Sequence, residues 1–156
     1  MTLRLLLLVN LLVYSVGVQD DEASRRALHL AERMAKSIRA CPERVITAQF
    51  KKQWVKETWG PPAAVKYDVE RTTSMLYPFT ASVDFALTVK HGKSYKTREA
   101  AAADDRLVPL LTGQYRNLYK FTKDDNIQLD STLVASSPGK WETRPTWSDA
   151  CWDKRP

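Results

Sequence analysis

The chain has 156 residues, of which 44% are hydrophobic and 27% charged, and its formal net charge is +6. This is ordinary globular usage, so composition excludes a disordered, collagen-like or low-complexity chain. Two cysteines and two histidines are too few for a multi-cysteine zinc module or a disulfide-dense miniprotein.

The first 17 residues have the three-part layout of a secretory signal peptide. Arg4 precedes an apolar run from Leu5 to Val13, and small residues follow at Ser15 and Gly17, as cleavage after Gly17 requires. An uncleaved anchor is the alternative, but the run is shorter than the roughly 20 apolar residues that a spanning helix needs. We therefore expect residues 1–17 to be a signal peptide that is removed.

Cleavage leaves residues 18–156, which we expect to form a single globular domain. Arg4 is the only charged residue lost, so the net charge falls from +6 to +5. No later apolar run is long enough to cross a bilayer. The expected product is secreted or periplasmic and has no stable membrane span after signal removal.

Cys41 and Cys151 are the only two cysteines of the chain. In an oxidising compartment an isolated pair usually closes, so we predict a Cys41–Cys151 disulfide. A bridge that closes so long a loop contributes about 4–5 kcal/mol in the chain-entropy model. Free thiols and an intermolecular bridge are the alternatives.

An amphipathic helix is predicted between the acidic residues 20–22 and Pro42. Acidic residues suit the positive end of a helix dipole, and proline cannot continue a helix. Apolar residues recur between these points at steps of three or four and form one stripe: Ala27, Leu30, Met34, Ile38 and Cys41. The stripe places Cys41 on the buried side, where its bridge would attach the helix end to the C-terminal segment.

Residues Arg44–Trp59 fit two patterns. Ile46, Ala48 and Phe50 alternate as in a strand, whereas Ile46, Phe50 and Trp54 also fit helical spacing. We favour a strand and keep a helix as the alternative. Gly60-Pro61-Pro62 then breaks the chain.

The rest of the chain alternates apolar and polar residues, as strands do. The predicted strands lie near residues 65–70, 81–89, 114–122 and 127–135. The alanine-rich segment 99–107 predicts a short helical turn, and residues 141–152 form an aromatic tail with no predicted element.

One helix followed by strands with hairpin-sized connections predicts an α+β fold, with an N-terminal helix packed on a curved antiparallel sheet of four to five strands. In element order alone, residues 22–145 resemble the cystatin-like and nuclear-transport-factor-like cone architectures. The Gln-x-Val-x-Gly loop of cystatin inhibitors is absent, as are the paired acid and base residues of cone-fold enzymes. The resemblance therefore implies an architecture and no activity.

Residues able to carry catalysis are sparse. His29 belongs to the predicted helix and His91 to a turn, and no Gly-x-Ser-x-Gly motif frames a serine nucleophile. The acidic groups 20–22 and 124–126 fit a helix cap and a hairpin turn and lack the further ligands of a calcium loop. We expect no catalytic, cofactor-binding or metal-binding residue, and no cofactor.

Cationic residues lie beside aromatic ones in two segments, 51–56 and 90–98. We expect them to cluster on one face if they mediate binding; they are Lys51, Lys52, Lys56, Lys90, Lys93, Lys96 and Arg98. Outside the cell such charge attracts an anionic surface or an acidic extracytoplasmic protein, whereas export makes nucleic acid a poor candidate.

Five tryptophans is a high count for this length, and they are Trp54, Trp59, Trp141, Trp147 and Trp152. Exposed tryptophans can stack on sugar rings, but they more often cover the open side of a small sheet. We expect packing and keep a ligand platform as the alternative.

The favoured hypothesis is an exported, non-catalytic binding or interaction module of unknown ligand. The alternative is a small cone-fold enzyme that uses carboxylates in a cavity, with Asp68, Glu70 and Asp84 as the candidates. A deep pocket that holds two of these acids would favour the enzyme, whereas a filled interior and a cationic face would favour the binding module.

Overall fold

The computed structural model describes residues 22–124, 126–137, 139–144 and 150–153. The predicted signal peptide and Trp147 lie outside these ranges. No helix in the described part of the chain is long and apolar enough to cross a membrane.

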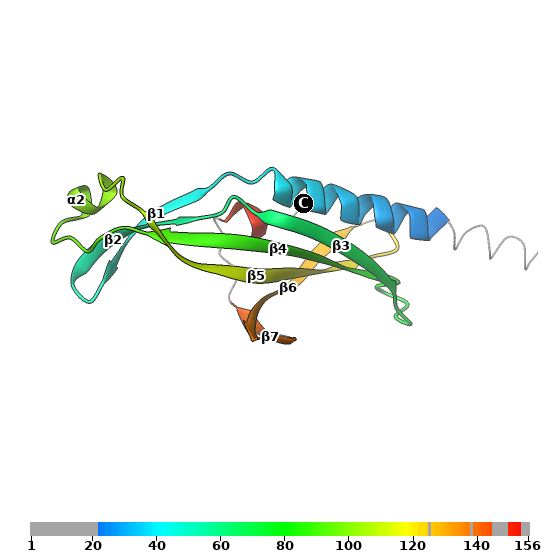
Figure 1. The fold of residues 1–156 in the computed structure, drawn as a ribbon. Helices are drawn as coiled ribbons and strands as arrows, with labels where there is room; N and C mark the ends of the chain where they lie inside the picture. Colours follow the sequence, from blue (N-terminus) through cyan, green and yellow to red (C-terminus); the bar gives the residue numbers. More distant parts are fainter. Residues whose placement is uncertain (1–21, 125, 138, 145–149, 154–156) are drawn as a thin grey trace, which may run out of the picture.

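A helix covers residues 22–39 and lies along one face of an antiparallel sheet (Figure 1). Its fully buried residues follow helical spacing, and they are Ala27, Ala31, Met34, Ala35 and Ile38. The predicted stripe is therefore the buried face, with Cys41 buried just beyond the helix end. Three of these residues are alanines, and their small side chains allow the helix to pack closely against the sheet.

Seven strands and two short helical elements follow. Their bounds are β1 Arg44–Phe50, β2 Gln53–Trp59, β3 Ala63–Arg71, β4 Phe79–His91, α2 Arg98–Ala102, β5 Val108–Phe121, β6 Ile127–Ser137, β7 Lys140–Arg144 and the 3₁₀ turn η1 Cys151–Asp153. Over the described residues the sheet has the order β1-β2-β4-β5-β6-β7, and β3 also pairs with β4. The α+β class with a helix on an antiparallel sheet is confirmed, and the expected count of four to five strands is wrong.

The two additional strands come from segments with weak local signals. Residues Arg44–Trp59 form the β1–β2 hairpin, so the helical alternative is wrong for this segment. Lys51 and Lys52 make its two-residue turn with φ of 49° and 66°. Two-residue turns of this kind usually contain Asn-Gly, and that dipeptide is missing here. The strand β7 forms at the start of the aromatic tail, just after Gly139 at φ 74°.

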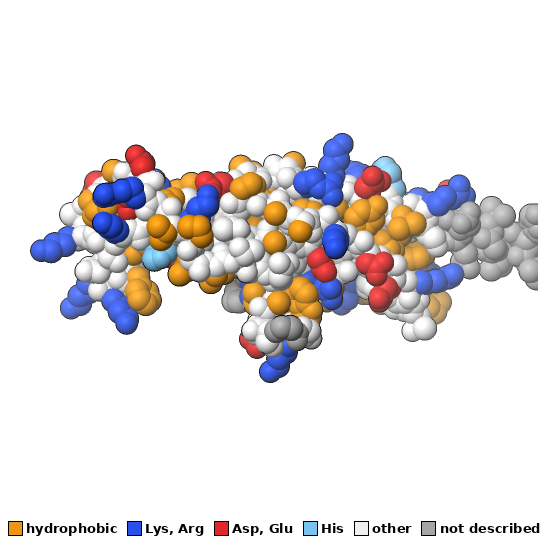
Figure 2. Space-filling model, viewed as in Figure 1, with side chains coloured by type: hydrophobic (Ala, Val, Ile, Leu, Met, Phe, Trp, Pro, Cys, Tyr) orange, Lys and Arg blue, Asp and Glu red, His pale blue; other side chains and the backbone are white. Residues whose placement is uncertain are grey.

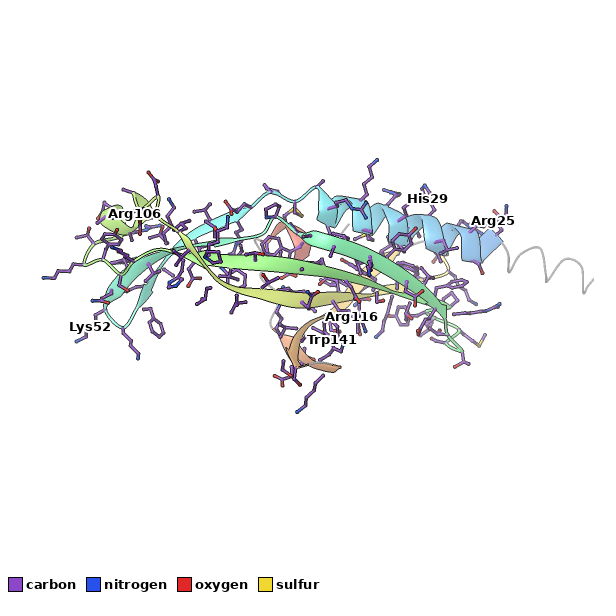
Figure 3. The ribbon with its side chains drawn as sticks, in the orientation of Figure 1. Arg25, His29, Lys52, Arg106, Arg116 and Trp141 are labelled. Atoms are coloured by element: carbon purple, nitrogen blue, oxygen red, sulfur yellow. A yellow bond between two sulfur atoms is a disulfide. The ribbon has the colours of Figure 1, made fainter. Side chains whose placement is uncertain are left out.

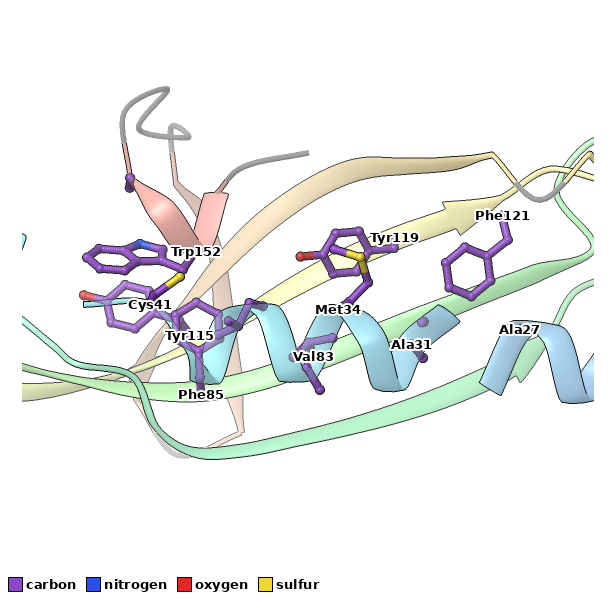
Figure 4. Packing of buried hydrophobic residues seen from close by; sticks show 14 of the residues in the cluster. Ala27, Ala31, Met34, Cys41, Val83, Phe85, Tyr115, Tyr119, Phe121 and Trp152 are labelled. Atoms are coloured by element: carbon purple, nitrogen blue, oxygen red, sulfur yellow. The ribbon is translucent and has the colours of Figure 1, made fainter. Parts of the chain in front are cut away.

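The core lies between the helix and the central strands β4, β5 and β6. Because side chains alternate across a strand, the odd-numbered residues of β4 and β5 face the helix. Phe85, Tyr119, Phe121 and Trp152 are the largest fully buried side chains of the core (Figure 4). Burial raises the pKa of Tyr119 to about 12.

The C-terminal segment is held in this core by a covalent bond and by polar contacts. The predicted disulfide between Cys41 and Cys151 is present, with 5.7 Å between the two Cα atoms and 110 positions between them in sequence. Nδ2 of the buried Asn117 donates to the carbonyl oxygen of Trp152 at 2.6 Å. Arg144 of β7 donates to both carboxylate oxygens of the buried Asp153 at 3.0 and 3.1 Å. The tail is thus attached to the helix end, to β5 and to β7.

Candidate functional site

The sheet extends beyond the helix at one end of the molecule, which we call the hairpin end and define as residues 43–59 and 90–111 (Figure 1). It contains the β1–β2 hairpin, the short helix α2 and the beginning of β5. Nine of the 24 Lys and Arg residues and five of the 18 acidic residues lie in these ranges, which gives a net charge of +4. Two thirds of the chain's formal excess of +6 is therefore at this end.

Backbone hydrogen bonds attach the β4–β5 connection to the hairpin. The N–H of Trp54 donates to the carbonyl oxygen of Tyr95 at 2.7 Å, and the N–H of Tyr95 donates to the carbonyl oxygen of Trp54 at 2.8 Å. The N–H of Gly92 donates to the carbonyl oxygen of Lys56 at 2.8 Å. These bonds extend the edge of β2, so the connection is held as part of the sheet.

The buried carboxylate of Asp104 holds the two ends of this connection together. It accepts hydrogen bonds from the backbone N–H groups of Lys93 at 2.9 Å and Arg106 at 3.0 Å. The bonds from Arg106 and then Lys93 hold the pKa of Asp104 below its ordinary value of 3.8. A Cβ atom on Gly92 would lie 2.6 Å from Oδ2 of Asp104, so the close approach needs glycine at that position.

The structure brings all seven predicted cationic residues to the hairpin end. Two of them interact with oxygen atoms of the protein itself. Nζ of Lys56 donates to the carbonyl oxygen of Asp104 at 3.0 Å, and Nζ of Lys90 lies 3.8 Å from a carboxylate oxygen of Glu43. Two others lie over aromatic rings. Nζ of Lys51 is 5.4 Å from the ring centre of Phe50, and the Arg98 guanidinium carbon is 5.9 Å from that of Trp54.

The remaining three, Lys52, Lys93 and Lys96, are exposed and make no ion pair with any residue that the structure describes. Arg106 adds an exposed cation that the sequence analysis did not include. Figure 3 shows Lys52 and Arg106 at the same end of the molecule. The only signal for Arg106 was its position just after Asp104-Asp105, which does not show where its side chain lies.

One face of the hairpin end carries most of its exposed apolar side chains, together with Arg44, Gln53, Glu57 and His91, and we call it the apolar face. Residues directly opposite each other in antiparallel strands point to the same side, so the registers of β1, β2, β4 and β5 define this face. Its apolar members are Ile46, Ala48, Phe50, Val55, Val108 and Leu111. Phe50 is 66% exposed, Val108 56% and Leu111 50%. Figure 2 shows cationic side chains around this end with hydrophobic ones between them.

The opposite face of the hairpin is the one that the β4–β5 connection covers. The side chains of Trp54 and Lys56 lie on this face and contact Arg98 and the backbone of Asp104. The apolar face is therefore the one that α2 leaves open.

The three carboxylates proposed for an enzyme lie on one sheet face, the face away from the helix. Asp68 and Glu70 of β3 share this face with Asp84 of β4. The Asp84 carboxylate accepts two hydrogen bonds from Arg116, one from Nε at 2.6 Å and one from Nη2 at 2.7 Å. This bonding to Asp84, with the charges of Asp68 and Glu70, raises the pKa of Arg116.

The hollow at these acids is small. It has a volume of about 150 Å³, and its lining includes Asp68, Glu70, Ser82 and Arg116 but not Asp84. Sites for drug-sized ligands usually measure about 300–1,000 Å³. The structure therefore places Asp68 and Glu70 at a shallow surface hollow, whereas Asp84 lies outside its lining and is paired with Arg116.

The two histidines considered for catalysis lie in different parts of the structure. His29 lies on the exposed side of the helix and His91 at the end of β4, so the structure does not bring the two histidines together (Figure 3). Within the described ranges no group of three His, Cys, Asp or Glu side chains is placed to hold a metal ion.

The tryptophans in the described residues are all buried or half-buried. Trp152 is fully buried and Trp59 packs against the core. Trp141 lies on the face away from the helix, where the guanidinium carbon of Arg116 is 4.5 Å from its ring centre (Figure 3). An arginine already occupies one side of that ring.

No family model, curated protein or solved structure matches the chain. Its function must therefore be inferred from the residues and geometry described above.

Proposed function

We propose that this chain is an exported, non-catalytic binding module that uses the hairpin end to bind an anionic partner. The observation that carries the proposal is the turn of the β1–β2 hairpin, in which Lys51 and Lys52 both have positive φ. This turn presents two cations at the tip of a region whose net charge is +4.

Lysine at such a position reduces stability. A non-glycine residue held at positive φ costs on the order of 1–3 kcal/mol, whereas Asn-Gly adopts the same two-residue turn with little strain. The turn thus keeps two cations where uncharged residues would be more stable. Strain of this kind is concentrated at functional sites.

The disulfide supports the exported part of the proposal. A bridge between Cys41 and Cys151 is compatible with an extracytoplasmic location, because disulfides form and persist in oxidising compartments. The same reasoning favours partners found outside the cytoplasm over nucleic acid.

The test is retention on immobilised heparin, used as a polyanion of known chemistry. The double substitution Lys51→Asn/Lys52→Gly should elute at clearly lower salt than wild type, because it removes two exposed cations. The same variant should unfold with a free energy about 1 kcal/mol higher or more, because it relieves the strained turn. Opposite changes in affinity and stability would assign the two lysines to binding.

The matched control is Lys66→Gln/Lys123→Gln, which removes the same charge from residues outside the hairpin end. It should elute close to wild type. Equal loss of retention in both variants would contradict the proposal, since binding would then follow net charge alone.

The enzyme remains the second candidate because Asp68, Glu70 and Asp84 do share one face. We rank it below the binding module because Arg116 occupies both carboxylate oxygens of Asp84 and the hollow beside it is about 150 Å³. Asp68 and Glu70 line this hollow, but its volume is below the range of about 300–1,000 Å³ that is usual for small-molecule sites.

We further propose a cone-type architecture, either cystatin-like or nuclear-transport-factor-like, on the basis of the helix lying along the sheet. The side chains of Phe85, Tyr119 and Trp152 fill the space between helix and sheet.

A further inference from the structure

We propose that the anionic partner of the hairpin end is the surface of a phospholipid bilayer, into which the exposed apolar face inserts. This inference rests on the proposed function, because it names the partner of the same site. Two separate features carry it: the excess of positive charge, and the exposed apolar side chains beside that charge.

The tip of the hairpin combines both features in adjacent residues. Phe50 is 66% exposed and directly precedes the Lys51-Lys52 turn. Peripheral proteins bind a bilayer through both kinds of group, since cations are attracted to anionic headgroups while apolar side chains enter the boundary with the acyl chains. The exposed Phe50 ring therefore offers an apolar group beside two cations, which is the combination that such binding uses.

The apolar face continues inward from the tip. Val108 and Leu111, at the start of β5, lie on the same side of the sheet as Phe50 and are at least half exposed. Single exposed apolar residues are normal on any protein surface. Here the pairing of four strands places several of them on one face, whereas on the other face, which contacts α2, Val45 is the exposed large apolar residue of the hairpin.

Charge and apolar surface together select the bilayer over other partners. A polysaccharide offers anionic groups but no apolar phase for Phe50. A second copy of this chain offers an apolar face but carries the same net charge of +4 at its hairpin end, so the two ends repel. An anionic bilayer offers both kinds of complementary surface.

The experiment measures sedimentation of the exported protein with two kinds of vesicle. One is pure phosphatidylcholine and the other contains about one-third phosphatidylglycerol. Wild type should bind only the second kind, and added salt should weaken that binding. All variants carry the same N-terminus as wild type, so any contribution of residues 1–17 is equal throughout.

The decisive variant is Phe50→Ser, which keeps every charge. It should bind the phosphatidylglycerol vesicles about tenfold more weakly, because it removes one large apolar side chain from the contact. Its retention on heparin should equal that of wild type. By contrast, Lys51→Asn/Lys52→Gly should weaken binding to both, with about a fivefold loss per lysine on vesicles.

The matched control removes exposed apolar surface elsewhere. Met75 and Leu76, in the β3–β4 connection at the other end of the molecule, are 78% and 73% exposed (Figure 1). Met75→Ser/Leu76→Ser should leave vesicle binding unchanged. Circular dichroism should show that each variant is folded. If Phe50→Ser folds poorly, vesicle binding of Val108→Ser, a substitution on the same face as Phe50, tests the same inference.

The outcomes separate this inference from the proposed function. Loss of vesicle binding with normal heparin retention in Phe50→Ser supports it. Equal vesicle binding by Phe50→Ser and wild type, or an equal loss in the Met75/Leu76 control, overturns it. If wild type is retained on heparin through Lys51 and Lys52 but binds no vesicle, the bilayer is wrong and the binding module stands. If it binds neither, both proposals fail.

Discussion

The two ends of this sheet share the strands β4 and β5 but differ in how their faces are covered. Over the helix, β4 and β5 contribute Val83, Phe85 and Tyr119 to a core that the helix and the C-terminal segment close. At the hairpin end the same strands continue without the helix and leave Val108 and Leu111 at least half exposed. A continuous ladder of hydrogen bonds can therefore support a stable core at one end and an open, cationic surface at the other.

This comparison predicts that the two ends respond separately to mutation. Changes in the helix-covered part should alter the free energy of unfolding and leave anion binding in place. Changes at the hairpin end should alter binding or local order and have small effects on global stability. Three predictions follow, from the largest expected effect to the smallest.

Replacing both Cys41 and Cys151 by serine should lower the free energy of unfolding by about 2–5 kcal/mol, because the bridge closes a loop of 110 positions. Urea unfolding with and without reductant measures the effect. At temperatures where the variant stays folded, its elution from heparin should match wild type. A shift in elution of the folded variant would show that the two ends are coupled.

Asn117→Ala should lower the free energy of unfolding by about 1–3 kcal/mol. The substitution leaves the carbonyl oxygen of Trp152 without the donor that now lies 2.6 Å away. The Asn117 side chain is completely buried, so water cannot replace this bond without rearrangement. Chemical denaturation gives the stability, and tryptophan fluorescence reports whether the Trp152 environment changes. A loss below about 0.5 kcal/mol would show that this bond contributes little to holding the C-terminal segment.

Asp104→Asn should loosen the β4–β5 connection with little change in global unfolding. Because the folded-state pKa of Asp104 lies below its ordinary value of 3.8, the carboxylate stabilises the folded connection above that pH. This contribution is lost as the pH falls through the lowered pKa. Relative to the intrinsic exchange rate at each pH, hydrogen exchange of the amides of Lys93 and Arg106 should therefore become faster in acid for wild type. In Asp104→Asn it should be fast at neutral pH already, and slow exchange there would contradict the assigned role.

The comparison also explains what the sequence could predict. The helix stripe and the four central strands depend on local periodicity, which the hydrophobic core enforces residue by residue. The disulfide follows from a count of two cysteines in a chain whose first residues predict export. These features belong mainly to the helix-covered part of the molecule.

The missed features depend on pairing between distant residues or on unusual turn chemistry. Lys51-Lys52 forms a turn that normally needs Asn or Gly, so nothing in the segment marked the hairpin. The contact between Asp84 and Arg116 depends on the register of β4 against β5, across 32 positions of sequence. Periodicity assigns residues to faces but does not choose partners, so the acids were predicted without the arginine that neutralises one of them.

The position of the disulfide has a further consequence for how the protein responds to proteolysis. Every strand of the sheet, from β1 to β7, lies between Cys41 and Cys151 in sequence. A protease that cuts once anywhere in that interval leaves two fragments that are still one covalent molecule, joined through the helix end and η1. The exposed β3–β4 connection, with Met75 and Leu76, could thus be nicked without releasing either piece, and the cut would be visible only after reduction.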